Sequence, residues 1–471
     1  MSSRSRSLLA SSFTAVLLAS LAACGGSPKP KSGLQGGGGG DVPDLPVHDG
    51  GDGGGGGGGG GDVPAPPGGG GGGGTQGTAP AKLSKDAKSD FGSAVEFFQK
   101  QAAAGWTQSG CRSAADQFAA VAREHKLVEA QYMVGRSYHA CGMAKEAEDG
   151  YQVALKLKPN HGVSISNLGE LYYQAGKIEG ARKYWESAIK ANPKLAAAYV
   201  NLAMLQLDDL RKAKDGAAWT KLDEDTRKKL SISLAIDNEN VRAYTTYGLV
   251  FMEGYEKNRN RLDMAKLLLE EGEKRNPKYA PLQHALGLLA LKKNNLTDAL
   301  TRFSAAVELD GDLSEARINV GLITLGFRRY DTAKDQFTKV LEKQPKNYDA
   351  IIGLGVAQRG LGDLAAAEAS YKKAKDLDPQ RGEAYFNLGV LYKDFRASKE
   401  ADLKSSQQTY RTAKAFFVEY KGKSGSPEDK EEADQNIKDC DKVIKQIDDF
   451  IKNMAAMPPM PPTPPAPAPG G

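Results

Sequence analysis

The sequence has few of the residues that build catalytic and metal sites. Its 471 residues include only 5 histidines and 4 cysteines. The histidines lack ligand spacing, and the cysteines form neither paired CxxC motifs nor the framework of a small disulfide-rich domain. HExxH and GxSxG motifs are absent, and the Gly-Lys-Ser at Gly422 lacks the upstream glycine of a P-loop because position 417 is Phe417. We therefore expect no enzyme activity, no metal and no cofactor.

The sequence also lacks a large excess of charge of one sign. Lysine and arginine number 63 and the acidic residues 58, for a net charge of +5. A nucleic-acid-binding protein would show a stronger basic excess or a basic face, so we expect no nucleic-acid partner. Aromatic residues make up only 7%, but the hydrophobic content of 40% is enough to bury a sizeable core.

The apolar stretch near the N-terminus is too short to span a membrane comfortably. It runs from Leu8 to Leu21, whereas a spanning helix needs about 20 predominantly apolar residues. Arg4 and Arg6 precede it. A short basic segment followed by a short apolar one is typical of a secretory signal peptide.

The stretch LAAC that ends at Cys24 resembles the bacterial lipobox, in which the cysteine is lipidated and becomes the first residue after cleavage. The resemblance implies a signal peptide over 1–23 and several acyl chains on Cys24, and more than one chain anchors a protein stably. Because Gly25 rather than aspartate follows, it favours an outer-membrane lipid anchor facing the periplasm over the inner membrane or the cell surface. The alternative is an ordinary signal peptide with an incidental cysteine.

Two segments have compositions that do not support a folded core. Residues 24–80 are mostly glycine, proline and aspartate, which predicts a disordered tether with a reach on the order of 40 Å. Residues 454–471 are rich in proline and favour polyproline II. This tail is either a docking peptide for a proline-binding module or a solvated end.

The middle of the chain repeats with a fixed period. Glycines recur 34 residues apart, at Gly135 and Gly169 and again at Gly287, Gly321, Gly355 and Gly389. A constant period in this range is typical of a solenoid of stacked helical pairs. A glycine inside a helix costs about 1 kcal/mol relative to alanine, so its recurrence indicates a packing reason.

The rest of the repeat is best seen over 167–193. Leu168, Gly169 and Tyr172 fall on a first helix and Ala181, Trp185 and Ala188 on a second, before Pro193. This order resembles the tetratricopeptide repeat. The resemblance implies an all-α solenoid with about eight helix-turn-helix repeats over 128–420, a degenerate helical pair over 81–127 and a capping helix over 426–453. Small residues such as Gly169 and Ala181 let the helices approach, and Trp185 is expected to fill the gap between neighbouring repeats.

Three repeats are longer than 34 residues, with the additions between their two helices. The longest addition contains Trp219, for which two interpretations stay open. The indole is either an exposed anchor for a partner or packs back on the helices.

The cysteines within the repeats raise a separate question. Cys111 is predicted to begin the second helix of the degenerate pair, and Cys141 to end the first helix of the following repeat. Because these helices should pack antiparallel, a disulfide between them is possible in an oxidising periplasm. The alternative is two small buried residues. Cys440 is expected to be a buried thiol.

The resemblance also implies a binding surface. In this family the first helix of each repeat lines a concave groove, where asparagines contact the backbone of an extended peptide. The matching positions here are Asn167, Asn201, Asn319 and Asn387, with Arg136, Tyr173, Arg242 and Lys393 nearby. The alternative is that these asparagines cap or solvate the groove.

We therefore expect a membrane-anchored scaffold or adaptor lipoprotein that binds proteins or peptides of the bacterial envelope and helps to assemble a multiprotein machine. The combination of lipobox, tether and repeats resembles the lipoproteins of gliding-motility and type IV pilus assembly machines. Two alternatives remain, a periplasmic peptide- or glycan-binding protein and a docking arm for an envelope enzyme.

Overall fold

The computed structural model describes residues 84–213 and 216–456. The proposed signal peptide, Cys24, the tether and most of the proline-rich tail lie outside them. Nineteen α-helices with short π- and 3₁₀-helical segments account for 83% of the described residues, which contain no strand. No helix in the described part of the chain has the length and apolar character needed to cross a bilayer. The predicted all-α repeat fold is confirmed.

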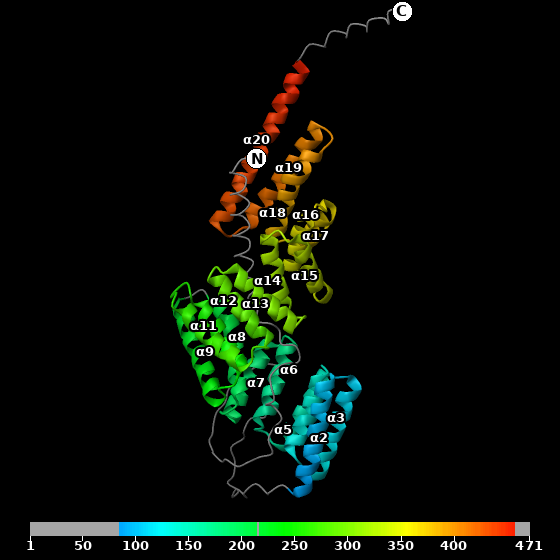
Figure 1. The fold of residues 1–471 in the computed structure, drawn as a ribbon, viewed down its shortest axis with the longest axis vertical. Helices are drawn as coiled ribbons and strands as arrows, with labels where there is room; N and C mark the ends of the chain where they lie inside the picture. Colours follow the sequence, from blue (N-terminus) through cyan, green and yellow to red (C-terminus); the bar gives the residue numbers. More distant parts are fainter. Residues whose placement is uncertain (1–83, 214–215, 457–471) are drawn as a thin grey trace, which may run out of the picture. The chain divides into compact units, whose positions relative to one another are not determined.

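The described residues form two compact units, 84–310 and 311–456, and within each unit consecutive helices pack as pairs (Figure 1). The first unit holds α2 (Lys85–Ala104), α3 (Gln108–His125), α4 (Val128–Ala140), α5 (Ala144–Leu157), α6 (Gly162–Gln174), α7 (Ile178–Ala191), α8 (Ala196–Lys212), α9 (Gly216–Ile236), α10 (Val241–Glu253), α11 (Arg261–Arg275), α12 (Ala280–Lys292) and α13 (Leu296–Leu309). The second holds α14 (Ser314–Gly326), α15 (Tyr330–Lys343), α16 (Tyr348–Gly360), α17 (Leu364–Leu377), α18 (Glu383–Val390), the π-helix η1 (Leu391–Arg396), the 3₁₀-helix η2 (Ala397–Lys399), α19 (Leu403–Lys423) and α20 (Pro427–Ala456).

In the five repeats of regular length, the turn between the two helices contains one residue in the left-handed region. Glycine occupies it at Gly142, Gly176 and Gly362, with φ of 68°, 75° and 86°. Asn294 and Arg328 occupy it with φ of 58°. Asparagine tolerates this region well, whereas an ordinary side chain such as that of Arg328 costs about 1 kcal/mol.

The recurring glycines make room for the large ring of the second helix. A Cβ at Gly355 would lie 2.5 Å from Cε1 of Tyr371 in the same repeat. Phe337 contacts Gly321 of its own repeat and Gly353 of the next one. The ring therefore fills the gap between repeats, as expected for the aromatic position, and also takes the space that a side chain on its own first helix would need.

The longest insertion lengthens two helices instead of forming a projecting loop. Trp219 is only 8% exposed on α9, and Nζ of Lys257 lies 3.6 Å from its ring centroid. One helical turn further, the buried carboxylate of Asp223 accepts hydrogen bonds from Arg261 at 2.7 and 3.1 Å. Trp219 thus packs back on the helices, which excludes its role as an exposed anchor.

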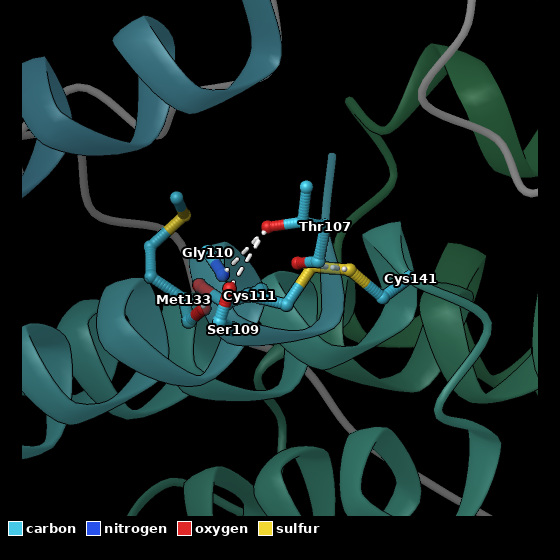
Figure 2. Close-up of a disulfide and its surroundings, with 7 residues drawn as sticks. Thr107, Ser109, Gly110, Cys111, Met133 and Cys141 are labelled. Carbon is cyan, nitrogen blue, oxygen red and sulfur yellow. Dashed lines mark hydrogen bonds between the residues drawn. A yellow bond between two sulfur atoms is a disulfide. The ribbon is translucent and has the colours of Figure 1, made fainter. Parts of the chain in front are cut away.

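Cys111 and Cys141 form a disulfide (Figure 2). Cys111 lies fully buried in the first turn of α3, and Cys141 is the C-cap residue of α4, with their Cα atoms 6.3 Å apart. The side chain of Thr107 caps α3 by accepting a hydrogen bond from the Gly110 amide at 3.0 Å. The bond therefore fixes the N-terminal helix pair to the repeat that follows it.

The last helix covers the end of the second unit. Cys440 of α20 is free and buried beside Phe417 of α19. Burial raises the pKa of its thiol to about 11. In the eighth repeat, which is longer than 34 residues, the π-helix η1 and the 3₁₀-helix η2 stand between α18 and α19.

Candidate protein-binding surface

The predicted groove residues are distributed over both units. Asn167 and Tyr173 lie on α6, Asn201 on α8, Arg136 on α4 and Arg242 on α10, all in the first unit. Asn319, Asn387 and Lys393 lie in the second unit, on α14, α18 and η1.

Asn167 is engaged within the protein. Its Nδ2 donates to the Val163 carbonyl oxygen at 2.9 Å and to Tyr132 Oη at 3.3 Å. Its Oδ1 accepts from Tyr151 Oη at 3.4 Å. The same tyrosine contacts Nδ1 of His139 at 3.1 Å. Asn167 therefore serves an internal network that joins the first two repeats.

Arg136 and His139 belong to the same network. Arg136 donates to Tyr132 Oη at 3.4 Å, and its guanidinium lies 5.9 Å from the Phe98 ring centroid. Burial lowers the pKa of His139 to about 4, so the imidazole is neutral near pH 7. These contacts stabilise the packing of α2, α4 and α6.

Asn201 differs from Asn167 because its side-chain oxygen has no hydrogen-bond partner among the described residues. The residue is 5% exposed. A buried acceptor without a donor costs about 1–3 kcal/mol. Because Asn201 stands at a predicted binding position, it is a candidate contact for a partner protein. Rotation of its amide would let the oxygen accept a hydrogen bond from that partner.

Arg242 is half-buried and has no carboxylate partner among the described residues. Its Nη2 contacts the Sδ atom of Met204 at 3.0 Å. Met204 lies three residues after Asn201 on α8, so the two side chains share one helix face. Met204 was not predicted, although its spacing from Asn201 could have indicated it.

Tyr173 completes this cluster. Burial, followed by the negative charges of Asp208 and Glu170, raises the pKa of the Tyr173 hydroxyl, and the positive charge of Arg242 opposes the rise. The Tyr173 ring packs against Trp185 with centroids 5.8 Å apart. We call Tyr173, Asn201, Met204 and Arg242 the Arg242 surface. It spans the first helices of three successive repeats.

The predicted residues of the second unit are more enclosed. Asn319 is fully buried. Asn387 donates to the Glu383 carbonyl oxygen at 2.9 Å and accepts from Arg359 at 3.3 Å. Lys393 donates to Asn436 Oδ1 at 2.6 Å, so α20 lies against it.

The second unit also has an open hollow of about 620 Å³ beside α19, lined in part by Lys375, Tyr385, Arg411, Lys414 and Glu419. Most of its charged groups already have partners. Lys375 lies 3.3 Å from Asp376, Lys414 lies 2.6 Å from Asp441 and Glu419 lies 3.8 Å from Lys423. The hollow therefore has less unpaired charge to offer a ligand than its composition suggests.

Comparisons with known proteins agree with the repeat assignment. Family models of the tetratricopeptide repeat match residues 164–195 and 321–382. A thermophilic tetratricopeptide protein of Thermus thermophilus, TTC0263, is 24% identical, with a TM-score of 0.36 over 42% of this chain and 99% of its own. Pseudomonas aeruginosa PilF is 21% identical, with a TM-score of 0.38 over 51% of this chain and 96% of its own.

YrrB, described as a tetratricopeptide protein with an unusual peptide-binding site, is 26% identical, with a TM-score of 0.31 over 42% of this chain and 95% of its own. A search of curated protein sequences found no match. The family-model matches over 164–195 and 321–382 show that the chain contains tetratricopeptide repeats, the architecture of protein-interaction scaffolds.

Proposed function

We propose that the protein is a lipid-anchored scaffold that binds an acidic segment of a partner protein at the Arg242 surface. The observation that carries this proposal is the half-buried guanidinium of Arg242, whose side chain contacts the Met204 sulfur and no carboxylate among the described residues. The repeat architecture supports protein binding as the general role.

The chemistry of the surface suits an acidic side chain on an extended segment. A guanidinium binds a carboxylate through two parallel hydrogen bonds, and a partly desolvated site strengthens them. Rotation of the Asn201 amide would let its oxygen accept a backbone N–H of the same segment. Tyr173 adds an aromatic surface that can cover an apolar neighbour.

The anchor is the second part of the proposal. The LAAC stretch ending at Cys24 supports lipidation, and Gly25 in place of aspartate favours attachment to the outer membrane, facing the periplasm. Residues 24–80 would then act as a tether that lets the repeats search for partners near the membrane. An assembly machine such as a gliding-motility or pilus complex is the proposed destination, supported by the layout of the sequence.

Cross-linking in intact envelopes, followed by purification and identification of partners, tests the binding site. Arg242→Gln should reduce recovery of the partner at least tenfold, because truncating a central arginine costs about 2 kcal/mol or more. Arg259→Gln is the matched control, since Arg259 is an exposed arginine in the same repeat. Equal recovery with Arg242→Gln and the control would disprove this binding site.

Membrane fractionation tests the anchor separately. Cys24→Ser should move the protein from the membrane to the soluble fraction. Retention of the variant in the membrane fraction would contradict lipid anchoring without affecting the binding test.

A further inference from the structure

Three side chains with metal-binding atoms meet where α2 and α3 pack together. Asp90 lies on α2, and Glu124 and His125 are the last two residues of α3. One ligand atom from each lies within 4.8 Å of the other two. Nε2 of His125 and Oδ2 of Asp90 are 2.8 Å apart. The sequence did not indicate this site because 35 residues separate Asp90 from His125.

The Asp90–His125 hydrogen bond does not by itself explain the third side chain. Glu124 brings a second carboxylate, with an oxygen within 4.8 Å of the Asp90 and His125 ligand atoms, and a cation placed among the three would be attracted by both carboxylates. Both α3 residues sit in its last turn, where the helix dipole also favours positive charge.

We propose that Asp90, Glu124 and His125 bind a divalent transition-metal ion, with Zn²⁺ as the best match. One imidazole nitrogen and two carboxylate oxygens form a donor set that zinc accepts at about 2.0–2.2 Å. Their combined charge balances that of the ion when the imidazole is neutral. Tetrahedral ligands at such distances stand roughly 3.3 Å apart. To admit the ion, His125 Nε2 and Asp90 Oδ2 must separate slightly from 2.8 Å. Glu124, which lies within 4.8 Å of both, must rotate toward the ion.

The ion would cross-link α2 and α3, the first two helices of the described residues. Without it, the only side-chain hydrogen bond or ion pair that the structure records between α2 and α3 is that of Asp90 with His125. The His125 side chain is 13% exposed and that of Asp90 47% exposed, so an ion can enter from solvent and keep water as its remaining ligand. A bound ion would hold α2 in place at the point where the N-terminal segment joins the folded body.

Isothermal titration of the full chain with ZnCl₂, after removal of metal with a chelator, tests the site. The chain should carry Cys24→Ser so that this thiol cannot compete for zinc. We expect one site with a dissociation constant in the micromolar range. Asp90→Asn, Glu124→Gln and His125→Ala should each weaken binding at least tenfold, because each removes one of three ligands.

Asp86→Asn is the matched control, because Asp86 is an exposed acid one turn earlier on the same helix. It should bind zinc as the parent chain does. Zinc should also raise the melting temperature of the parent by a few degrees and leave that of His125→Ala unchanged. The proposal is wrong if the parent chain does not bind zinc, or if any of the three ligand variants binds zinc as tightly as the parent.

Discussion

Gly169 of α6 lies directly against the indole of Trp185 on α7: a Cβ at Gly169 would be 2.6 Å from Trp185 Nε1. The same nitrogen donates a hydrogen bond to the Ser166 carbonyl oxygen at 3.0 Å. The ring is therefore held in one orientation by a bond to the helix on which it rests. This contact explains why glycine recurs at a position where alanine would favour the helix.

Gly169→Ala should destabilise the first unit. The added methyl group must displace a fully packed indole, which costs about 1–3 kcal/mol and outweighs the gain in helix propensity of about 1 kcal/mol. Gly92→Ala is the matched control, because Gly92 lies inside α2 with no atom near the position of a new Cβ. It should gain stability, and urea denaturation measures both changes. Equal gains in the two variants would contradict tight packing at Gly169.

Removal of the Cys111–Cys141 disulfide should lower the free energy of unfolding by about 4 kcal/mol. The bond closes a loop with a sequence separation of 30 residues, and the estimate follows from the chain entropy that this closure removes from the unfolded state. Denaturation of the Cys111→Ala/Cys141→Ala variant, compared with the parent under oxidising and reducing conditions, measures the effect. Reductant should weaken the parent alone. A parent that is insensitive to reductant would show that the bond contributes nothing to stability.

Acid should weaken the first unit through three buried histidines. Burial lowers the pKa values of His139, His161 and His284 to about 4 from an ordinary 6.5. Between these two pKa values the unfolded chain binds more protons than the folded one, so stability is complete above about pH 6.5 and is lost as the pH falls toward 4. Each histidine contributes up to roughly 3 kcal/mol of this loss.

Denaturation curves between pH 4.5 and 7.5 measure the dependence. His284→Leu should flatten it, because leucine needs no proton in the unfolded state. If His284→Leu shows the same pH slope as the parent, His284 does not contribute to the acid sensitivity.

The ion pair of Asp223 with Arg261 should be essential to the inserted part of the third repeat. The side chains are 4% and 12% exposed. Asp223→Ala leaves the buried guanidinium with only backbone carbonyl partners and no carboxylate to balance its charge, which should cost about 3–5 kcal/mol. Glu270→Ala removes the surface partner of Lys266 and should cost less than about 1 kcal/mol. Thermal unfolding of both variants tests the contrast, and similar melting temperatures would argue against a structural role for the buried pair.

Replacement of Asn201 and of Asn167 by leucine should have different effects on the free energy of unfolding. Asn201→Leu removes an acceptor without a partner among the described residues and should leave stability unchanged or raise it by about 1 kcal/mol. Asn167→Leu breaks bonds to Tyr132 and Tyr151 and should lower stability by about 1–3 kcal/mol. Chemical denaturation of the two variants distinguishes these outcomes. Equal destabilisation would mean that the Asn201 amide is satisfied within the fold.

The sequence alone determined the repeat fold. Its 34-residue spacing of glycines reflects contacts that are local, because each first helix packs on the second helix of its own repeat, as Gly355 does on Tyr371. A local contact that recurs leaves a regular pattern in the sequence. The fold class can therefore be predicted from the sequence.

Only the tertiary structure decided matters that depend on which side chains meet across repeats. In the structure, Trp219 is buried beneath Lys257 and Cys111 is bonded to Cys141. Arg242 contacts Met204 and has no carboxylate partner among the described residues. The structure also brings Asp90 to His125. Each of these pairs occurs once and joins residues from different parts of the chain, so no sequence period indicates them. Side-chain packing and charge determine them only after the helices have stacked.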